Sequence, residues 1–196
     1  MFTSLKLPFD FDPGRLTVDL GVIAADEWVP HFNKSIYEGD WSGVALRSVD
    51  GRATQLYPDP TATDRFADTE TLGRCPYYRE VLATLRCPLT SVRLLRLQAG
   101  SSIAEHRDYR LGYEDGEVRL HVPVVTDVGV AFFLAGVRVP MAAGECWYLN
   151  VNLPHRVENR SPIDRIHLVI DCVVNEWLAQ IFRLESHGGG SDGERT

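Results

Sequence analysis

The sequence predicts a mainly β domain, a barrel or sandwich of short strands with helices on its N-terminal side. Short strand-like runs follow one another at close spacing from about residue 91 to residue 174, with turn residues between them. Two helix-type patterns that begin with proline come before this region. The length of 196 residues, with 44% hydrophobic and 24% charged residues, suits one globular domain.

The N-terminal region opens with a short apolar stretch, residues 5–11, and then a helix start. Asp12 is suited to the N-cap and Pro13 to the first helical position. This helix should end before Pro30 and pack across the outside of the sheet. We expect His31, just beyond it, to be a surface or hydrogen-bonded histidine and not a metal ligand. One face of the helix would carry Leu16, Leu20 and Ile23.

The next segment predicts a hairpin, a long loop and a second helix. Residues 41–48 alternate loosely, and the turn signal Val49-Asp50-Gly51 leads into the β-prone run 53–57, which predicts a hairpin. Residues 58–75, rich in Pro, Asp and Thr, predict a long loop that forms part of the substrate entrance. A helix should begin at Pro76 and stop before Pro88.

The rest of the chain predicts successive strands, which would form the rigid core of the domain. A loop at residues 111–117 should lie at the rim that bears the candidate site. The expected strands are residues 92–98, 103–109, 118–126, 130–134, 137–141, 145–151, 156–159 and 165–174. We expect a single domain over residues 1–183, with its core at about 91–174, and a disordered tail over 184–196 that has little to bury.

Charge and cysteine usage exclude several functional classes. The net charge of −7 with no compensating basic cluster argues against nucleic-acid binding. No secretory leader and no apolar run of membrane-spanning length is present, so we expect no membrane partner. The four cysteines show no Cys-x-x-Cys spacing, which favours free thiols and a cytoplasmic protein. No pattern indicates an oligomeric state.

The sequence feature with the clearest chemistry is a His-x-Asp pair, His106 and Asp108, in a segment with strand character. Side chains two residues apart on a strand point to the same side. One imidazole and one carboxylate supply two corners of a two-histidine, one-carboxylate metal triad. His155, beyond a turn that contains Pro154, is well placed in the sequence to supply the third. Such a triad leaves open positions on Fe(II) for other ligands.

Arg165 opens an apolar run that has the pattern of a central strand. An arginine there would normally reach solvent. Near a metal, its two-pronged donor set could instead grip the distal carboxylate of a dicarboxylate ligand.

These motifs together resemble the aspartyl/asparaginyl β-hydroxylase family of Fe(II)/2-oxoglutarate dioxygenases, and in particular its small bacterial branch that includes the cis-proline hydroxylases. The resemblance covers roughly residues 92–174, and the motifs occur in family order. They are His106-Arg-Asp-Tyr109, Val118-Arg-Leu-His-Val-Pro123, Gly144-Glu-Cys-Trp-Tyr-Leu-Asn150, Leu153-Pro-His155 and Arg165-Ile-His-Leu-Val-Ile-Asp171.

The resemblance implies a double-stranded β-helix, that is, a cupin-like jelly roll with flanking N-terminal helices. It assigns His106, Asp108 and His155 to Fe(II), and Arg165 to the distal carboxylate of 2-oxoglutarate. It also implies that Arg119 and His121 face the co-substrate. The implied reaction couples oxidative decarboxylation of 2-oxoglutarate by dioxygen to hydroxylation of an amino acid, free, in a peptide or bound to a carrier.

Two other functions remain open at this point. A cupin-type metal dioxygenase or isomerase would use the same triad without 2-oxoglutarate, and would have no need for Arg165. A non-catalytic cupin module that binds a small acid would have no need for the metal triad.

Overall fold

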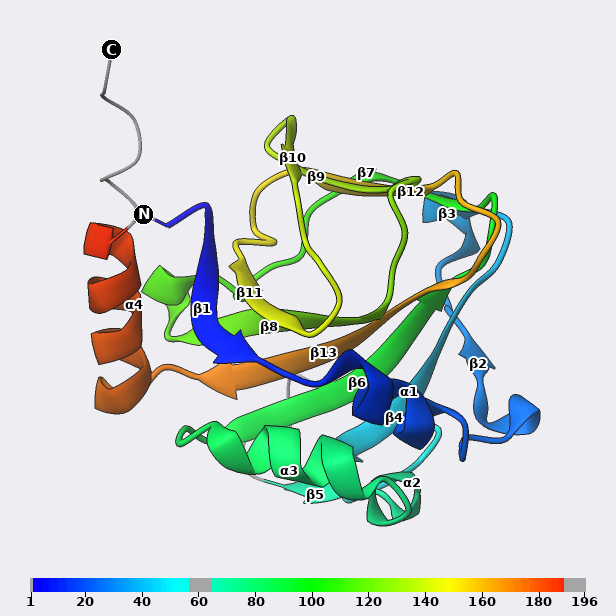
Figure 1. Cartoon of the computed structure of the whole chain (residues 1–196), viewed down its shortest axis with the longest axis horizontal. Coiled ribbons are helices and arrows are strands. Elements are labelled where there is room, and N and C mark those ends of the chain that lie inside the picture. The colour runs from blue at the N-terminus through cyan, green and yellow to red at the C-terminus, as the bar shows by residue number, and fades with distance from the viewer. Residues whose placement is uncertain (1, 57–64, 189–196) are drawn as a thin grey trace.

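The computed structural model describes residues 2–56 and 65–188, and it has two antiparallel sheets that face each other (Figure 1). Neighbour by neighbour, the larger sheet contains β1 (Ser4–Asp10), β11 (Glu145–Leu149), β8 (Glu117–Val125), β13 (Arg165–Val173), β6 (Leu89–Leu97), β4 (Trp41–Val49) and β2 (Val29–Pro30), with β5 (Phe66–Asp68) paired to β4. The smaller sheet contains β10 (Val137–Val139), β9 (Val130–Leu134), β12 (His155–Asn159), β7 (Ser102–His106) and β3 (Tyr37–Glu38). The mainly β jelly-roll prediction is confirmed.

Helices cover the outer face of the larger sheet (Figure 1). These are α1 (Pro13–Leu20), α2 (Glu70–Gly73) and α3 (Pro76–Thr84), while α4 (Glu176–Gly188) packs beside β1. Both proline-initiated helices begin where the sequence predicted. The Asp12 carboxylate caps α1 by accepting from the amide of Gly14 at 2.8 Å. Among the described residues, no helix has the length and apolar character needed to cross a membrane.

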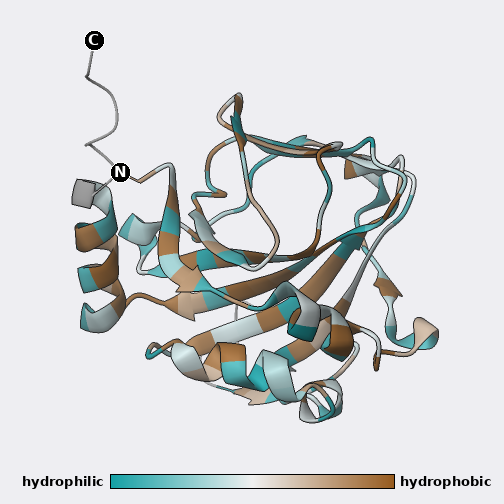
Figure 2. Cartoon of the chain, in the orientation of Figure 1, coloured by the Kyte–Doolittle hydropathy of each residue, from teal (hydrophilic) through white to brown (hydrophobic). Residues whose placement is uncertain are grey.

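The central strands of the larger sheet have one apolar face and one polar face, because side chains alternate along a strand. One face packs with the helices in the first core and includes Val92, Leu94, Val118, Leu120, Leu168 and Ile170. The alternate positions face the space between the two sheets and include Arg93, Arg119, His121, Arg165 and His167. Figure 2 shows the resulting interspersion of hydrophobic and hydrophilic residues along these strands. The chain therefore places charged residues on the inner face of a buried sheet.

A second apolar core lies between the sheets, beside those polar positions. Its buried members include Leu97, Ile103, Phe132, Leu134 and Val157. The strands of the smaller sheet contribute half of the ten buried members among the described residues, and this core holds the two sheets together beside the cavity.

The predicted hairpin at residues 41–57 is wrong. Residues 53–56 form a turn and irregular backbone, and Tyr57 lies outside the described residues. Strand β4 instead pairs with β5, which lies inside the segment expected to be a loop, as does α2. The Arg47 side chain on β4 stabilises this pairing, because its guanidinium donates to Phe66 O at 2.9 Å and to Asp68 Oδ1 at 2.6 Å on β5.

Other boundaries also differ from the sequence predictions. Most of the apolar stretch 5–11 lies in strand β1, which ends at Asp10 and pairs with β11. Strand β7 ends at His106, short of the predicted residue 109. Helix α4 extends past residue 183, where we expected the domain to end, and residues 189–196 lie outside the described part.

Candidate metal centre

Two histidines face each other where β7 ends and β12 begins. His155 pairs with His106 across these antiparallel strands, and the two ring centroids lie 4.2 Å apart. The Nδ1 atom of His106 lies 2.9 Å from the carbonyl oxygen of Ala104, and Nδ1 of His155 lies 3.0 Å from that of Leu153. A carbonyl oxygen can only accept, so each Nδ1 carries the proton, and in the neutral ring Nε2 keeps its lone pair.

Burial keeps one of these rings neutral. Burial, together with the neighbouring His106, lowers the pKa of His155 to about 4. A neutral imidazole whose other nitrogen donates to a backbone carbonyl is the usual form of a metal-bound histidine.

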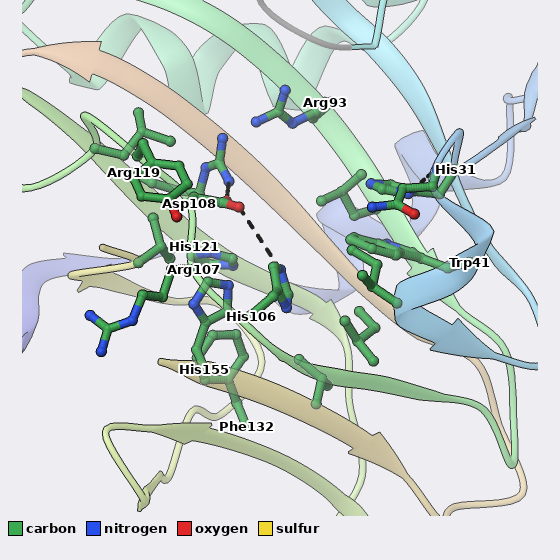
Figure 3. A pocket seen from close by; sticks show the side chains of 18 of the residues that line it. His31, Trp41, Arg93, His106, Arg107, Asp108, Arg119, His121, Phe132 and His155 are labelled. Atoms are coloured by element: carbon green, nitrogen blue, oxygen red, sulfur yellow. Dashed lines mark hydrogen bonds and ion pairs between the residues drawn. The ribbon is translucent and has the colours of Figure 1, made fainter. Parts of the chain in front are cut away.

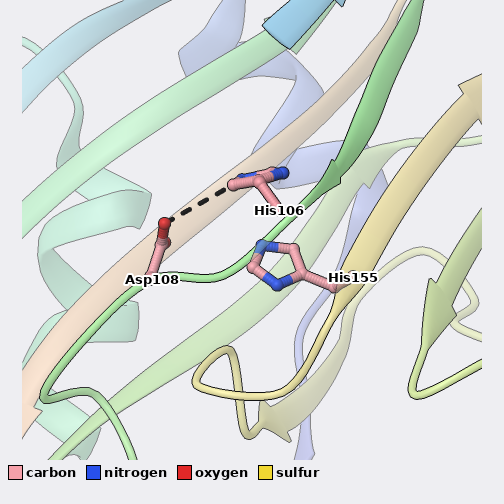
Figure 4. Close-up of side chains that lie close together, drawn as sticks. All are labelled: His106, Asp108 and His155. Atoms are coloured by element: carbon pink, nitrogen blue, oxygen red, sulfur yellow. Dashed lines mark ion pairs between the residues drawn. The ribbon is translucent and has the colours of Figure 1, made fainter.

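Asp108 joins the two histidines from just beyond the end of β7 (Figure 4). The sequence argument placed it on the same strand as His106, and this was wrong: it lies in the following loop, where its amide donates to Val151 O at 2.9 Å. Even so, one ligand atom from each of the three residues lies within 4.8 Å of the other two. The group has the donor types of a two-histidine, one-carboxylate site for Fe(II).

The three side chains open onto a cavity of about 470 Å³ between the two sheets (Figure 3). Phe132 lies beside His155 with nearly parallel rings, and Trp41 lies beyond His106 at 6.4 Å between ring centroids. All six residues singled out in the sequence line this one cavity: His106, Asp108, Arg119, His121, His155 and Arg165.

Arg165 lies in this cavity without a carboxylate partner among the described residues. Its side chain is buried, its Nε atom has no hydrogen-bond partner, and one terminal nitrogen donates to Nδ1 of His167 at 2.8 Å. Burial lowers the pKa of Arg165 to about 9, which still leaves it charged at neutral pH. A buried charge is costly unless it is paired, so this guanidinium requires an anion.

His121 is a second incomplete polar group in the cavity. Both of its ring nitrogens are buried and have no hydrogen-bond partner in the described chain. Burial, followed by the charge of Arg165, holds the pKa of His121 well below its usual range. It is therefore a neutral ring without a hydrogen-bond partner among the described residues.

Arg119 makes contacts that the sequence did not indicate. Its guanidinium forms ion pairs with Asp171 and with Asp108, the candidate carboxylate ligand. It still lines the cavity, so one residue contacts both a candidate ligand and the open interior.

Sequence reasoning missed part of the cavity wall. His31 is buried, not at the surface, and it accepts a hydrogen bond at Nδ1 from the amide of Asn33, as the alternative expectation held. Its ring stacks on Trp41 with 3.6 Å between centroids. No local pattern indicates this contact. Arg93 did carry a signal, because it is a charged residue between Val92 and Leu94 in an otherwise apolar strand.

Comparison with known proteins shows what this chain is similar to. A family model described as aspartyl/asparaginyl β-hydroxylase matches residues 20–174. An L-proline cis-4-hydroxylase of Rhizobium meliloti (strain 1021) is 28% identical over 163 residues, which is 82% of this chain and 57% of that protein. The chain therefore spans little more than half the length of this relative.

Two solved structures share the fold. A Pseudomonas putida prolyl-4-hydroxylase has a TM-score of 0.54 at 15% identity, with 88% of this chain and 92% of that chain covered. The non-heme α-ketoglutarate-dependent epimerase SnoN from nogalamycin biosynthesis has a TM-score of 0.54 at 16% identity, with 86% and 76% covered. At these identities the likeness concerns the fold alone.

Proposed function

The chain belongs to the aspartyl/asparaginyl β-hydroxylase family, and from this premise we propose that it is an Fe(II)/2-oxoglutarate-dependent dioxygenase that hydroxylates an amino acid, free, in a peptide or on a carrier. The observation that carries this proposal is a combination within one cavity. A His-Asp-His cluster shares that cavity with a buried arginine that has no carboxylate partner within residues 2–56 and 65–188.

The donor set of the cluster fits Fe(II). The Nε2 atoms of His106 and His155 and one oxygen of Asp108 would hold the ion, and three positions would stay open. When bound, Fe(II) with 2-oxoglutarate and dioxygen supplies the oxidising power that replaces a C–H bond by C–OH.

Arg165 would seat the far carboxylate of 2-oxoglutarate. Its exposed fraction is only 2%, so the contact would form away from bulk water, where a charge-assisted pair is strongest. Neither ring nitrogen of His121 has a hydrogen-bond partner in the described chain, so its N–H would donate to another oxygen of the same acid. A dicarboxylate would therefore satisfy both incomplete groups at once.

The rest of the cavity wall would receive the substrate. The stacked rings of His31 and Trp41 form one side, with Ile36 and the exposed Phe32 also lining the space. Trp41 Nε1 is buried and lacks a hydrogen-bond partner in the described chain. A mostly apolar wall with a spare donor suits an amino-acid side chain that also carries an acceptor. The cis-4-hydroxylase relative acts, by its name, on L-proline.

The partners we propose are therefore Fe(II), 2-oxoglutarate, dioxygen and a small-molecule or peptide substrate. Cys75, Cys87, Cys146 and Cys172 are all free. Free thiols and an Fe(II) site both suit a reducing compartment, so we place the protein in the cytoplasm.

Two measurements test this function. Anaerobic addition of 2-oxoglutarate to the Fe(II)-loaded protein should produce a weak visible charge-transfer absorption band, because the 2-oxo acid then binds the ion directly. Succinate release should next be measured across free amino acids and short peptides in the presence of dioxygen. We expect one substrate class to stimulate succinate formation well above the rate without substrate.

The same measurements separate the alternatives. A cupin-type enzyme that does not use 2-oxoglutarate would bind Fe(II) but show neither the band nor succinate. A non-catalytic module that binds a small acid would release no succinate with any of these substrates. Either result would overturn the proposal.

A further inference from the structure

The buried carboxylate of Asp171 lies near the candidate metal centre, on a central strand of the larger sheet. Asp171 on β13 is 1% exposed and faces the interior between the sheets. Its neighbour across the strand pair is Arg119 on β8, and Arg93 on β6 approaches from the other side. Three adjacent central strands thus each contribute one charged residue to a single cluster.

The contacts among these residues are close and directional. Arg119 binds Asp171 with two parallel hydrogen bonds, Nε to Oδ1 at 2.7 Å and Nη2 to Oδ2 at 2.9 Å. Arg93 adds a bond from Nη2 to Oδ2 at 2.8 Å. A guanidinium is planar, so a two-pronged contact fixes both its position and its orientation.

With Asp171 holding one edge of the guanidinium, the remaining nitrogen of Arg119 points to the metal cluster. Its Nη1 atom donates to Oδ2 of Asp108 (Figure 3). The other oxygen, Oδ1, lies 3.9 Å from Nε2 of His106. One carboxylate oxygen is therefore held by Arg119, and the other lies on the side of His106.

Asp108 needs such a contact because its own backbone does not fix the side chain. It lies beyond the end of β7, and its side chain is 30% exposed. His106 and His155, by contrast, are on strands, and backbone carbonyls hold their rings.

We propose that Asp171 is a positioning residue that acts through Arg119: it fixes the guanidinium, which in turn holds Asp108 so that Oδ1 faces the ion. This inference rests on the proposed function, because it gives Asp108 the role of a metal ligand. It assigns to a residue outside the cluster a share of the metal affinity, and it gives Arg119 a task other than contact with the co-substrate.

Loss of the Asp171 charge should weaken metal binding through its effect on Arg119. Asn in its place cannot accept both bonds from Arg119, so the freed guanidinium has Asp108 as its remaining carboxylate partner. Arg119 would then compete with the ion for that carboxylate. Residues that hold metal ligands in place contribute about 10- to 100-fold to metal affinity.

The test is the affinity for Co(II), a redox-stable probe of an Fe(II) site, measured on the full chain without 2-oxoglutarate or dioxygen. We expect Asp171→Asn to raise the Co(II) dissociation constant by about ten-fold or more. The matched control is Asp19→Asn, which changes another buried carboxylate that accepts the Tyr78 amide at 2.8 Å, away from the cavity. Its Co(II) affinity should equal that of the wild type.

A double-mutant cycle distinguishes positioning from a general loss of structure. In an Arg119→Gln background, the Asp171→Asn change should alter the dissociation constant by less than about two-fold, because the residue that transmits its effect is gone. A wild-type-like affinity for Asp171→Asn alone would overturn the inference. So would an undiminished effect of that change in the Arg119→Gln background.

Removal of one partner from a buried ion pair can prevent folding, so a second variant protects the test. Arg119→Lys keeps the charge but has one nitrogen, which cannot grip Asp171 with two prongs and reach Asp108 as well. It should weaken Co(II) binding by about ten-fold. If Asp171→Asn does not fold, wild-type affinity in Arg119→Lys overturns the inference.

Failure of this inference and of the proposed function give different results. A wild-type chain that binds Co(II) but never 2-oxoglutarate overturns the function and leaves the positioning role intact. Wild-type Co(II) affinity in the Asp171 and Arg119 variants overturns the positioning role and leaves the proposed function intact. A wild-type chain that binds no Co(II) overturns both.

Discussion

At the scale of single residues, the arginines of the cavity differ in whether a carboxylate compensates their charge. Arg119 shares Asp171 with Arg93, and it also contacts Asp108. Burial would lower the pKa of Arg119, but the charges of Asp171 and Asp108 outweigh burial and raise it. Arg165 has no such compensation among the residues described, and burial lowers its pKa. The uncompensated charge is the one suited to an external anion.

Replacement of Arg165 should therefore weaken 2-oxoglutarate binding specifically. Arg165→Ala removes a charge-assisted two-pronged contact worth about 2–4 kcal/mol, which corresponds to about 30- to 1,000-fold in affinity. Titration of the Fe(II)-loaded protein under anaerobic conditions measures it.

Two controls make this prediction specific. Fe(II) affinity without 2-oxoglutarate should stay unchanged in Arg165→Ala. The exposed Arg160, paired with Glu158, provides a matched Arg160→Ala variant that should bind 2-oxoglutarate like the wild type. Unchanged 2-oxoglutarate affinity in Arg165→Ala would contradict the assigned role.

The sequence motifs correctly predicted which residues line the cavity, but not the backbone element on which each of them lies. His106, Asp108, His155 and Arg165 were singled out from sequence and line one cavity. The argument that put Asp108 on a strand face was wrong, because β7 ends two residues earlier. Asp171 could not be found in this way, since its partners Arg93 and Arg119 lie far away in the sequence. The contact of His31 with Trp41 was missed because no local pattern indicates that the two rings stack.

At the scale of elements, one face of each central strand packs in the core and the opposite face lines the cavity. On β8 the buried apolar residues, such as Leu120, pack in the core below the helices, and their neighbours Arg119 and His121 face the cavity. A continuous strand pattern predicted these elements well. Strands β1 and β5 were missed because each is defined by its partner strand, β11 or β4, and not by a strong pattern of its own.

The cap of α1 tests the outer layer separately from the site. Asp12→Ala removes the carboxylate that accepts from the amides of Gly14 and Arg15, and it should destabilise the protein by about 1 kcal/mol. Chemical denaturation measures the loss. Metal affinity should not change, because the helix lies on the opposite side of the larger sheet from the cavity.

Asp26→Ala, which changes an exposed acidic residue in a short 3-10 helix, is a suitable control for Asp12→Ala. It should leave stability within about 0.5 kcal/mol of the wild type. Equal losses in the two variants would mean that Asp12 does not act as a cap.

At the scale of the whole molecule, several buried histidines couple stability to pH. Burial is the first cause of a lowered pKa at each of them, and it brings the pKa of both His31 and His155 to about 4. The pKa values of His121 and His167 are also lowered well below the usual range. An unfolded histidine has a pKa of about 6.5, so below this pH the unfolded chain binds more protons.

The metal-free protein should therefore lose stability as pH falls from 6.5 toward 4. One histidine with this shift contributes about 2 kcal/mol less at pH 5 than at pH 7.5, so the free energy of unfolding should drop by at least that much. Urea denaturation at the two pH values measures it. His31→Phe, which keeps a ring stacked on Trp41, should show a smaller drop. Equal stability at both pH values would contradict burial of neutral histidines.

The central claim is that His106, Asp108 and His155 hold one metal ion, and anaerobic Fe(II) titration tests it most directly. We expect one Fe(II) per chain and a loss of affinity of about 100-fold or more in Asp108→Ala. Glu105→Ala, which changes an exposed carboxylate on β7 next to His106, should bind like the wild type. Equal affinity in Asp108→Ala and Glu105→Ala would contradict the claim.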